Sequence, residues 1–128
     1  MAFEVWFRKA ERFREYARED LANNRFDSAA FFAQQAIEVL LKELLIKLIG
    51  TRPITYSTAE LLQYLAKTLN AQPPSDVVRC AEALEVHYIQ ARYPDARIND
   101  YRRWEAEEAI RCMEVVWSYV REVVGSVA

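Results

Sequence analysis

Hydrophobic residues recur every three or four positions along most of the chain, the spacing that places them on one face of an α-helix. A first helix is predicted to end near Asn23 or Asn24, two residues that favour turns. The rest of this segment is mostly Arg and Glu, so we expect it to bury a single stripe. That stripe consists of Trp6, Ala10, Phe13, Ala17 and Leu21.

A second helix is predicted to start at Asp27 or Ser28, either of which can accept free amide hydrogens at a helix start. It continues to Ile49 and stops at Gly50. Because its apolar side chains cover more than one stripe, we expect this helix to be central, with neighbours on several sides. These side chains are Phe31, Ala33, Ile37, Leu40, Leu41, Leu44, Leu45 and Leu48.

Three more helices are predicted in the second half of the chain. Ser57 and Glu60 have the spacing at which each side chain satisfies a backbone amide of the other at a helix start. A fourth helix is expected from its cap, Ser75, to Tyr93, because a following proline disfavours helical geometry. After a loop over residues 94–99, a last helix is predicted to end at Gly125. The buried face of the third helix carries Leu61, Leu62, Leu65 and Leu69.

Composition supports a helical fold. The chain has 2 Gly and 4 Pro in 128 residues, where average usage would give about nine and about six. So few turn-forming residues leave little room for hairpins and nearly exclude an all-β fold. With 52% hydrophobic residues and a net charge of −2, the chain is typical of one globular domain. We therefore expect an all-α fold, an up-and-down antiparallel bundle of four to five helices, in a single domain over residues 1–128.

Metal sites and membrane segments are not expected. Cys80 and Cys112 are far apart in sequence and are interpreted as small core residues, in preference to a disulfide or a reactive thiol. The one histidine, His87, makes a zinc or iron site improbable. The opening residues carry charges throughout, and the most apolar stretch, residues 36–49, is interrupted by four charged side chains. We expect a cytoplasmic protein without a metal or other cofactor.

Local positive charge is densest between the last two predicted helices. Arg92, Arg97, Arg102 and Arg103 lie there against only two aspartates. A cation at a helix C-terminus is favoured by the helix dipole and needs no ligand, so these arginines can be ordinary surface residues. Alternatively, their planar donor groups suit phosphate oxygens of a nucleotide or of RNA.

Two segments resemble a known family. Residues 33–38, Ala-Gln-Gln-Ala-Ile-Glu, with their flanking residues 27–31 and 40–42, resemble the second-helix signature of the HEPN (higher eukaryotes and prokaryotes nucleotide-binding) family. Residues 87–96, His-Tyr-Ile-Gln-Ala-Arg-Tyr-Pro-Asp-Ala, are similar to the family's YYI-x-x-RYPDA segment, found in stand-alone prokaryotic members. This resemblance implies a helical bundle that forms a homodimer and binds nucleotides or RNA. It also implies a minimal nucleotidyltransferase as partner in a toxin–antitoxin pair.

Many members of this family are metal-independent ribonucleases with an arginine and a histidine separated by four to six residues. The resemblance places the arginine, which holds the scissile phosphate, at Arg92, and after four intervening residues the histidine position is occupied by Arg97. A guanidinium stays protonated at neutral pH and cannot act as a general base. Longer spacings reach Ile98 or Asn99, and neither transfers protons. Asn99 also occupies the position of a tyrosine that the transferase modifies in some members.

His87 is the residual candidate for proton transfer. It precedes Arg92 by five residues, so the two side chains diverge by roughly 140° around a helix and do not share a face. A packed residue is therefore the favoured interpretation of His87. Glu85 and Tyr88 do share the face of Arg92, where Glu85 would orient the arginine and Tyr88 would pack.

Other polar and aromatic residues have structural interpretations. Gln34 and Gln35 are acceptable in a helix, and one of the two must be partly exposed. Trp6, Trp104 and Trp117 are expected to anchor the core or an interface. Of the three, Trp104 alone could stack on a base, because it adjoins two arginines.

Three hypotheses about function follow. The first is a binding module without catalytic residues, in which Arg92 and Arg97 contact phosphate, supported by Tyr93, Asp95 and Arg102. The second is a metal-independent ribonuclease that uses Arg92 with an atypical proton donor or acceptor such as His87. The third is a purely structural protein that sequesters a nucleotidyltransferase partner.

Overall fold

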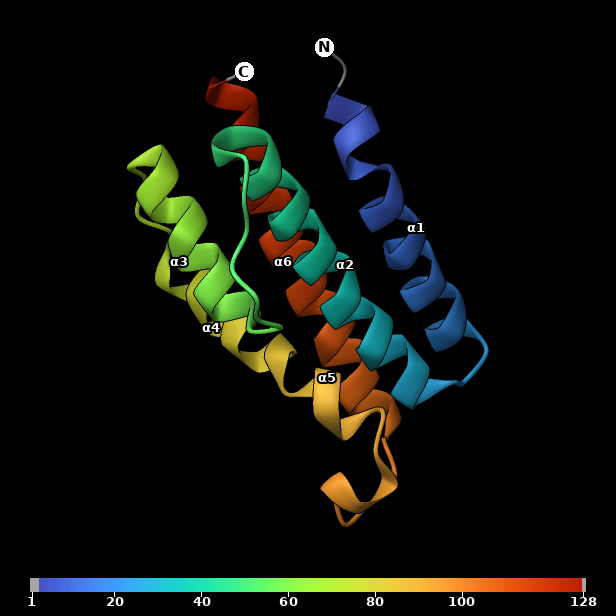
Figure 1. Ribbon diagram of the computed structural model, residues 1–128. Helices are drawn as coiled ribbons and strands as arrows, with labels where there is room; N and C mark the ends of the chain where they lie inside the picture. Colours follow the sequence, from blue (N-terminus) through green and yellow to red (C-terminus); the bar gives the residue numbers. More distant parts are fainter. Residues whose placement is uncertain (1–2, 128) are drawn as a thin grey trace.

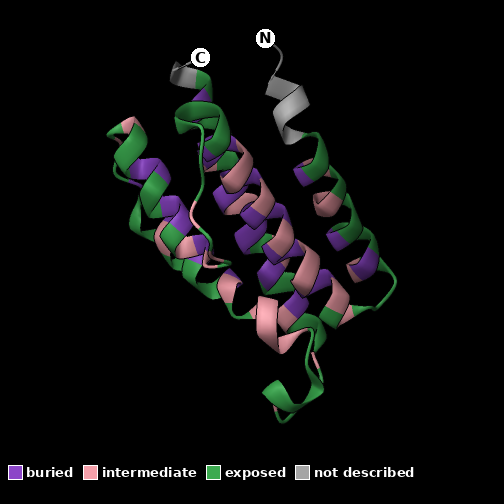
Figure 2. Ribbon diagram, in the orientation of Figure 1, coloured by how far each residue is buried: buried purple, intermediate pink, exposed green. Residues whose placement is uncertain are grey.

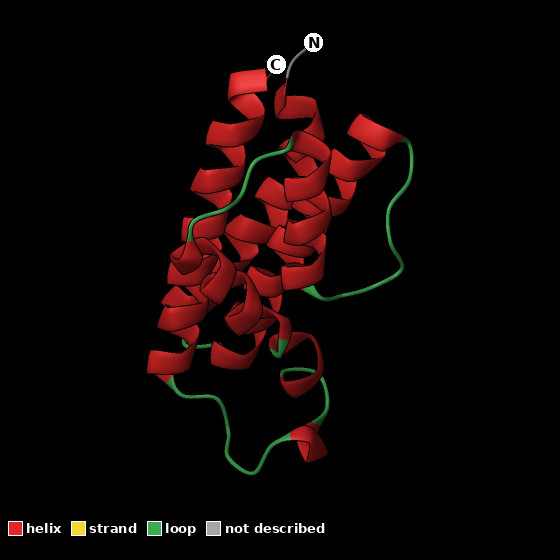
Figure 3. Cartoon of the chain, turned by 90° about the vertical axis from the view of Figure 1, so that its left-hand side faces the viewer, coloured by secondary structure: helices red, strands yellow, loops and turns green. Residues whose placement is uncertain are grey.

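The computed structural model describes residues 3–127, and it describes the side chains of residues 8–125. All regular structure in this part of the chain is helical, in agreement with the predicted all-α bundle (Figure 3). Trp6 lies outside the described side chains. The elements are α1 (Phe3–Ala22), α2 (Phe26–Ile49), α3 (Thr58–Leu69), α4 (Ser75–Glu85), α5 (His87–Gln90), the 3₁₀ turn η1 (Pro94–Ala96) and α6 (Arg103–Val127).

Helix α2 is central, as predicted. It packs against α1, α3 and α6 and also contacts α4 and α5 (Figure 1). Burial follows the same pattern, since 11 of the 24 residues of α2 are buried (Figure 2). The fully buried large apolar residues of α2 are Ile37, Leu40, Leu41, Leu44 and Leu45. Leu48 differs from this group because it lies near the end of α2 and is 38% exposed.

The termini of the helices confirm some sequence predictions. Gly50 ends α2 in the left-handed conformation with φ +77°, and the Oγ of Ser57 accepts a hydrogen bond from the amide of Glu60 at 3.1 Å. The amide of Ser57 instead donates to Thr55 Oγ1, so only one half of the expected reciprocal cap forms. Asn24 has a positive φ of 62° just after α1 ends.

Other termini differ from the prediction. Helix α2 begins at Phe26, so neither Asp27 nor Ser28 is its cap residue. Asp27 Oδ1 does accept a free amide hydrogen at the helix start, from Ser28, whereas the hydroxyl of Ser28 donates to the buried carboxylate of Asp20. Helix α4 has Pro74 at its cap position, with Ser75 as its first residue. Helix α6 continues through Gly125. A glycine within an exposed stretch of helix costs about 1 kcal/mol of stability relative to alanine, which the helix tolerates.

The predicted fourth helix is divided in two. Helix α4 ends at Glu85 and α5 at Gln90, whereas the sequence predicted one helix to Tyr93. The backbone of Val86 keeps helical φ and ψ angles. The division at this residue is therefore a break in the helical hydrogen-bonding pattern. Tyr93 itself is extended, with φ −117° and ψ 118°, as expected for a residue before proline.

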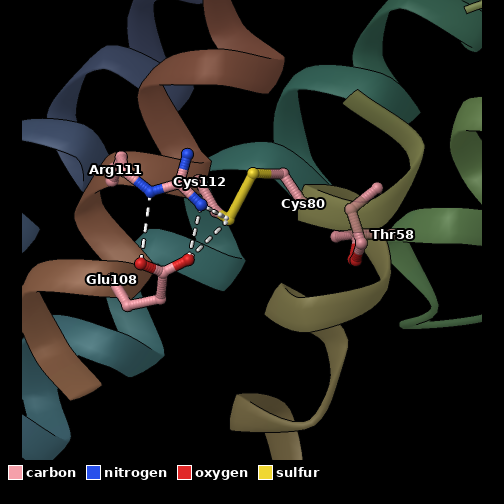
Figure 4. Close-up of a disulfide and its surroundings, with 6 residues drawn as sticks. Thr58, Cys80, Glu108, Arg111 and Cys112 are labelled. Carbon is pink, nitrogen blue, oxygen red and sulfur yellow. Dashed lines mark hydrogen bonds and ion pairs between the residues drawn. A yellow bond between two sulfur atoms is a disulfide. The ribbon is translucent and has the colours of Figure 1, made fainter. Parts of the chain in front are cut away.

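The two cysteines correct another expectation. Cys80 and Cys112 are core residues, 4% and 2% exposed, but they also form a disulfide between α4 and α6 (Figure 4). Their Cα atoms are 4.8 Å apart, which is within the range of disulfide-bonded residues. No local signal in the sequence indicated this pairing, because the packing of α4 on α6, and not spacing along the chain, brings the thiols together.

The two tryptophans whose side chains are described lie in different environments. Trp117 is 3% exposed and belongs to the core, as predicted, whereas Trp104 is 65% exposed and is not a core residue of this chain. None of the helices in the described part of the chain combines the length and the apolar character needed to cross a lipid bilayer.

Candidate functional site

One end of the bundle contains a pocket of about 460 Å³. Its walls come from two segments that are distant in sequence, and both lie near the lower end of the view in Figure 1. The first is the α1–α2 corner (residues 23–27), and the second is the last residue of α5 with the α5–α6 loop (residues 90–102). The corner contributes Asn24, Phe26 and Asp27, and the other wall consists of residues 90–94 and 97–101. Arg103, the first residue of α6, donates a hydrogen bond to Asn24 Oδ1 and thus connects the α1–α2 corner with the helix that follows the other wall.

The α1–α2 corner is fixed by a buried carboxylate. Asp20 is 8% exposed and accepts hydrogen bonds from the guanidinium of Arg25, at 2.7 Å, and from the hydroxyl of Ser28. The guanidinium of Arg103 also lies over the ring of Phe26, 5.1 Å from its centroid. Side chains from α1, α2 and α6 thus fix the position of this pocket wall.

Arg92 is held by aromatic faces. Its guanidinium carbon lies 4.9 Å from the ring centroid of Tyr88, 5.4 Å from that of Tyr93 and 6.0 Å from that of Phe31. Among the described residues, no carboxylate forms an ion pair with Arg92. Contacts with ring faces leave the N–H groups of a guanidinium able to bind an anion. Tyr88 therefore packs as predicted.

Arg97 has a different environment, because its guanidinium is bound within the protein. It donates two hydrogen bonds to the carboxylate of Glu105, at 2.6 and 2.8 Å, and one from Nε to the carbonyl of Asn99 at 2.6 Å. Its side chain is 17% exposed, and its guanidinium carbon lies 3.9 Å from the ring centroid of Tyr101. Of its three nitrogens, Nη1 is buried without a partner in the described part of the chain. Arg97 thus fastens the α5–α6 loop to the start of α6.

The pKa values of this pair follow from the same contacts. Burial opposes the charged form of Arg97, but the hydrogen bonds with Glu105 and Tyr101 outweigh burial and raise the pKa of its guanidinium. Burial would likewise raise the pKa of Glu105, but hydrogen bonds from the Arg102 amide and from Arg97 lower it. Both groups therefore stay charged at neutral pH.

His87 lies beside the pocket and does not line it. Its Nδ1 shares a hydrogen bond of 2.7 Å with the hydroxyl of Tyr101. Burial lowers the pKa of His87 to about 4, with Glu105 opposing and Arg97 reinforcing the shift. The imidazole is therefore neutral at physiological pH and packed, in agreement with the favoured interpretation of the sequence.

The pocket brings together three of the five residues predicted to bind phosphate: Arg92, Tyr93 and Arg97. Asp95 and Arg102 do not line it; both are exposed, Asp95 in η1 and Arg102 before α6. Glu85 does not orient Arg92 as expected. Its carboxylate instead accepts hydrogen bonds from Ser57 Oγ at 2.7 Å and from the Ala59 amide at 3.3 Å.

Sequence reasoning missed the wall formed by the α1–α2 corner. The sequence predicts Asn24 only as a turn residue and Asp27 only as a helix cap. No local signal connects them with residues 90–101, because the packing of α1, α2 and α6 brings the two segments together. Among the described residues, no three His, Cys, Asp or Glu side chains form a group that could hold a metal.

Comparisons with known proteins agree with this architecture. The model of the HEPN domain family matches residues 3–123. The crystal structure of TT1696 from Thermus thermophilus superposes with a TM-score of 0.82 at 32% identity, covering 94% of this chain and 96% of that one. The structure of ST0689, described as an archaeal HEPN homologue, gives a TM-score of 0.73 at 28% identity, covering 100% and 99%.

No curated protein matches the sequence. The family match spans nearly the whole chain, and both structural similarities extend over at least 94% of it. The chain therefore belongs to the HEPN domain family.

Proposed function

We propose that this chain is a non-cleaving HEPN module that binds the phosphate of a nucleotide or of RNA through Arg92. The environment of the Arg92 side chain carries this proposal. Aromatic rings hold its guanidinium at the pocket, and no described carboxylate neutralises it. A charge-assisted, two-pronged contact with phosphate oxygens suits such a group.

The size and composition of the pocket support the same function. Its volume of about 460 Å³ is within the range of small-molecule sites. Polar side chains of Asn24, Asp27 and Asn99 line it together with Phe26 and Tyr93. Such a mixture of amides, a carboxylate and rings can accommodate a base or sugar beside the phosphate.

The protonation states of Arg97, His87 and Tyr101 support binding without cleavage. Cleavage by the family's ribonucleases needs a group that gains and loses a proton beside the arginine. The position of that group is occupied by Arg97, whose guanidinium is bonded to Glu105 and whose raised pKa keeps it protonated. His87 is bonded to Tyr101 and does not line the pocket. Burial raises the pKa of the Tyr101 hydroxyl, so this group also stays protonated at neutral pH.

Replacement of Arg92 tests the binding function. We expect Arg92→Ala to weaken binding of a fluorescently labelled single-stranded RNA about tenfold at low salt, the loss of one charge-assisted contact of about 1.4 kcal/mol. Arg92→Lys should be intermediate, because it keeps the charge and loses the planar fork. Fluorescence anisotropy measures the affinity, and thermal unfolding should stay nearly unchanged because Arg92 is exposed.

A matched control is Arg79→Ala. Arg79 is an exposed arginine on α4 that does not line the pocket, so its removal changes the net charge by the same amount. Equal affinities of wild type and Arg92→Ala would exclude the proposed site. Equal weakening by Arg79→Ala would show that the effect depends on net charge alone. Arg97 is left intact in this test, because its ion pair with Glu105 belongs to the fold.

A further inference from the structure

Tyr56 lies in the connection between α2 and α3, far from the pocket residues in sequence. This connection runs back along α2 (Figure 1), so that the backbone of Tyr56 lies beside that helix. The carbonyl oxygen of Tyr56 accepts a hydrogen bond of 3.0 Å from Nε2 of Gln34, in the first half of α2. Tyr56 does not line the pocket, and 41% of its surface is exposed. A surface loop residue is thus tied to the central helix.

A buried polar network fixes Gln34. Its side chain is 0% exposed, and Nε2 also donates to Glu38 Oε1 at 2.9 Å. Glu38 in turn forms an ion pair of 2.7 Å with Lys42. Because each of these side chains is bonded to the one a turn away, Gln34 has little freedom to move. It therefore presents a fixed donor to the α2–α3 connection.

The residues after Tyr56 are fixed from the other side. Ser57 donates its hydroxyl to Glu85 at 2.7 Å, and Thr58 donates its hydroxyl to the carbonyl of Ala81 at 2.5 Å. Both acceptors belong to α4. The backbone at Tyr56 is therefore held between α2 and α4, which determines where its ring can lie.

The ring of Tyr56 stacks on Tyr88. Their centroids are 4.3 Å apart and their planes differ by 10°. Since a parallel ring at this distance covers one face of Tyr88, the guanidinium of Arg92, 4.9 Å from the same centroid, is expected on the other face. Tyr56, Tyr88 and Arg92 then form one continuous stack that connects α2 with the pocket.

We infer that Tyr56, anchored by Gln34, is a positioning residue for Arg92; this inference rests on the proposed phosphate-binding function of Arg92. Arginine has many rotamers, and ordering it on ligand binding has an entropic cost. A Tyr88 ring that cannot turn provides a fixed face for the guanidinium. Tyr56 thereby raises phosphate affinity without touching the ligand.

Substitutions at Tyr56 test this inference in the full chain with the same labelled single-stranded RNA. Tyr56→Ala should weaken binding about threefold to tenfold, within the usual range of coupling between contacting residues. Tyr56→Phe should bind as the wild type does, because it keeps the stacking ring. Tyr64→Ala, which removes a tyrosine of α3 with 43% exposure, is the matched control and should have no effect.

A double substitution distinguishes positioning from direct contact. In an Arg92→Ala background, Tyr56→Ala should cause no further loss, because the side chain that it positions is absent. Further weakening of the same size in that background would overturn the inference and indicate that Tyr56 contacts RNA itself. Unchanged affinity of Tyr56→Ala, with Arg92→Ala still weakened, would overturn the inference and leave the proposed function intact. Unchanged affinity of Arg92→Ala would instead overturn the proposed function.

Thermal unfolding accompanies each measurement. If Tyr56→Ala does not fold, Tyr56→Leu takes its place, because it keeps apolar bulk and lacks a planar ring. Weakened binding by folded Tyr56→Leu and rescue by Tyr56→Phe are the expected results. Equal weakening by the Leu and Phe variants would show that the stack with Tyr88 has no part in binding.

Discussion

Reduction of the disulfide between Cys80 and Cys112 is expected to lower the free energy of unfolding by about 3–4 kcal/mol. The bond joins α4 to α6 and closes a loop with a sequence separation of 32 residues (Figure 4). Without the bond the unfolded chain can adopt many more extended conformations, which lowers its free energy, whereas the packed helices stay in place. Urea unfolding followed by circular dichroism, with and without an equilibrated reductant, measures the difference.

Reduction is a cleaner test than mutation, because replacing both cysteines also removes buried side-chain volume. The Cys80→Ala/Cys112→Ala variant serves as the control, since a reductant should not change its stability. Thiol titration of the denatured protein without reductant should find no free thiol from this pair. Two free thiols, or identical unfolding curves with and without reductant, would contradict the disulfide.

Acidification is expected to destabilise the protein between about pH 6.5 and about pH 4 through His87. Burial lowers the pKa of His87 in the folded chain from 6.5 to about 4, so in this window the unfolded chain binds more protons. Stability therefore rises with pH through the window and is lost as the pH falls. This difference in pKa lowers the free energy of unfolding by about 2 kcal/mol when the pH falls from about 7.5 to about 5.

Substitution of His87 isolates this effect. The pKa values of Glu105, Glu108 and Glu114 are lowered from 4.5, so these carboxylates act mainly below about pH 4.5. Between about pH 5 and about pH 7.5, His87→Gln should therefore give a much flatter dependence of unfolding free energy on pH. The same slope in both proteins would show that His87 is not the group responsible.

The helices could be predicted from the sequence because their signals are local. The three-to-four-residue spacing identified the stripe containing Ala10 and Ala17, and the wider apolar surface of α2 predicted its central position. Turn residues such as Asn24 and Gly50 marked the correct ends. Helix starts were less accurate, because Ser28 can satisfy its hydroxyl on Asp20, a partner eight residues away, instead of capping the helix.

The sequence predicts only part of the site, because only contacts between residues close in sequence give a local signal. Arg92, Tyr93 and Arg97 are close in sequence, and the pocket contains all three. Tertiary packing supplies the other contacts: the corner at Asn24, the Cys80–Cys112 disulfide and the Tyr56–Tyr88 stack. Neither spacing nor composition encodes such pairs, since each depends on how helices pack.

Arg97 shows a further limit of inferring chemistry from a sequence position. An arginine among other arginines suggests a second phosphate contact, but Arg97 pairs with Glu105, a residue of α6 that lies eight positions further along the chain. The ion pair makes Arg97 a support for the loop that carries Arg92. This arrangement leaves Arg92 as the main candidate for phosphate binding in the pocket.

We propose that Arg92 binds phosphate beside a position, Arg97, that cannot transfer a proton. The most direct measurement incubates the purified protein with end-labelled single-stranded RNA in EDTA, and follows binding by anisotropy and RNA length by denaturing gel. We predict that the wild type binds the RNA and leaves it intact over hours, whereas Arg92→Ala binds it weakly. Rapid metal-independent cleavage that Arg92→Ala or His87→Ala abolishes would contradict the account.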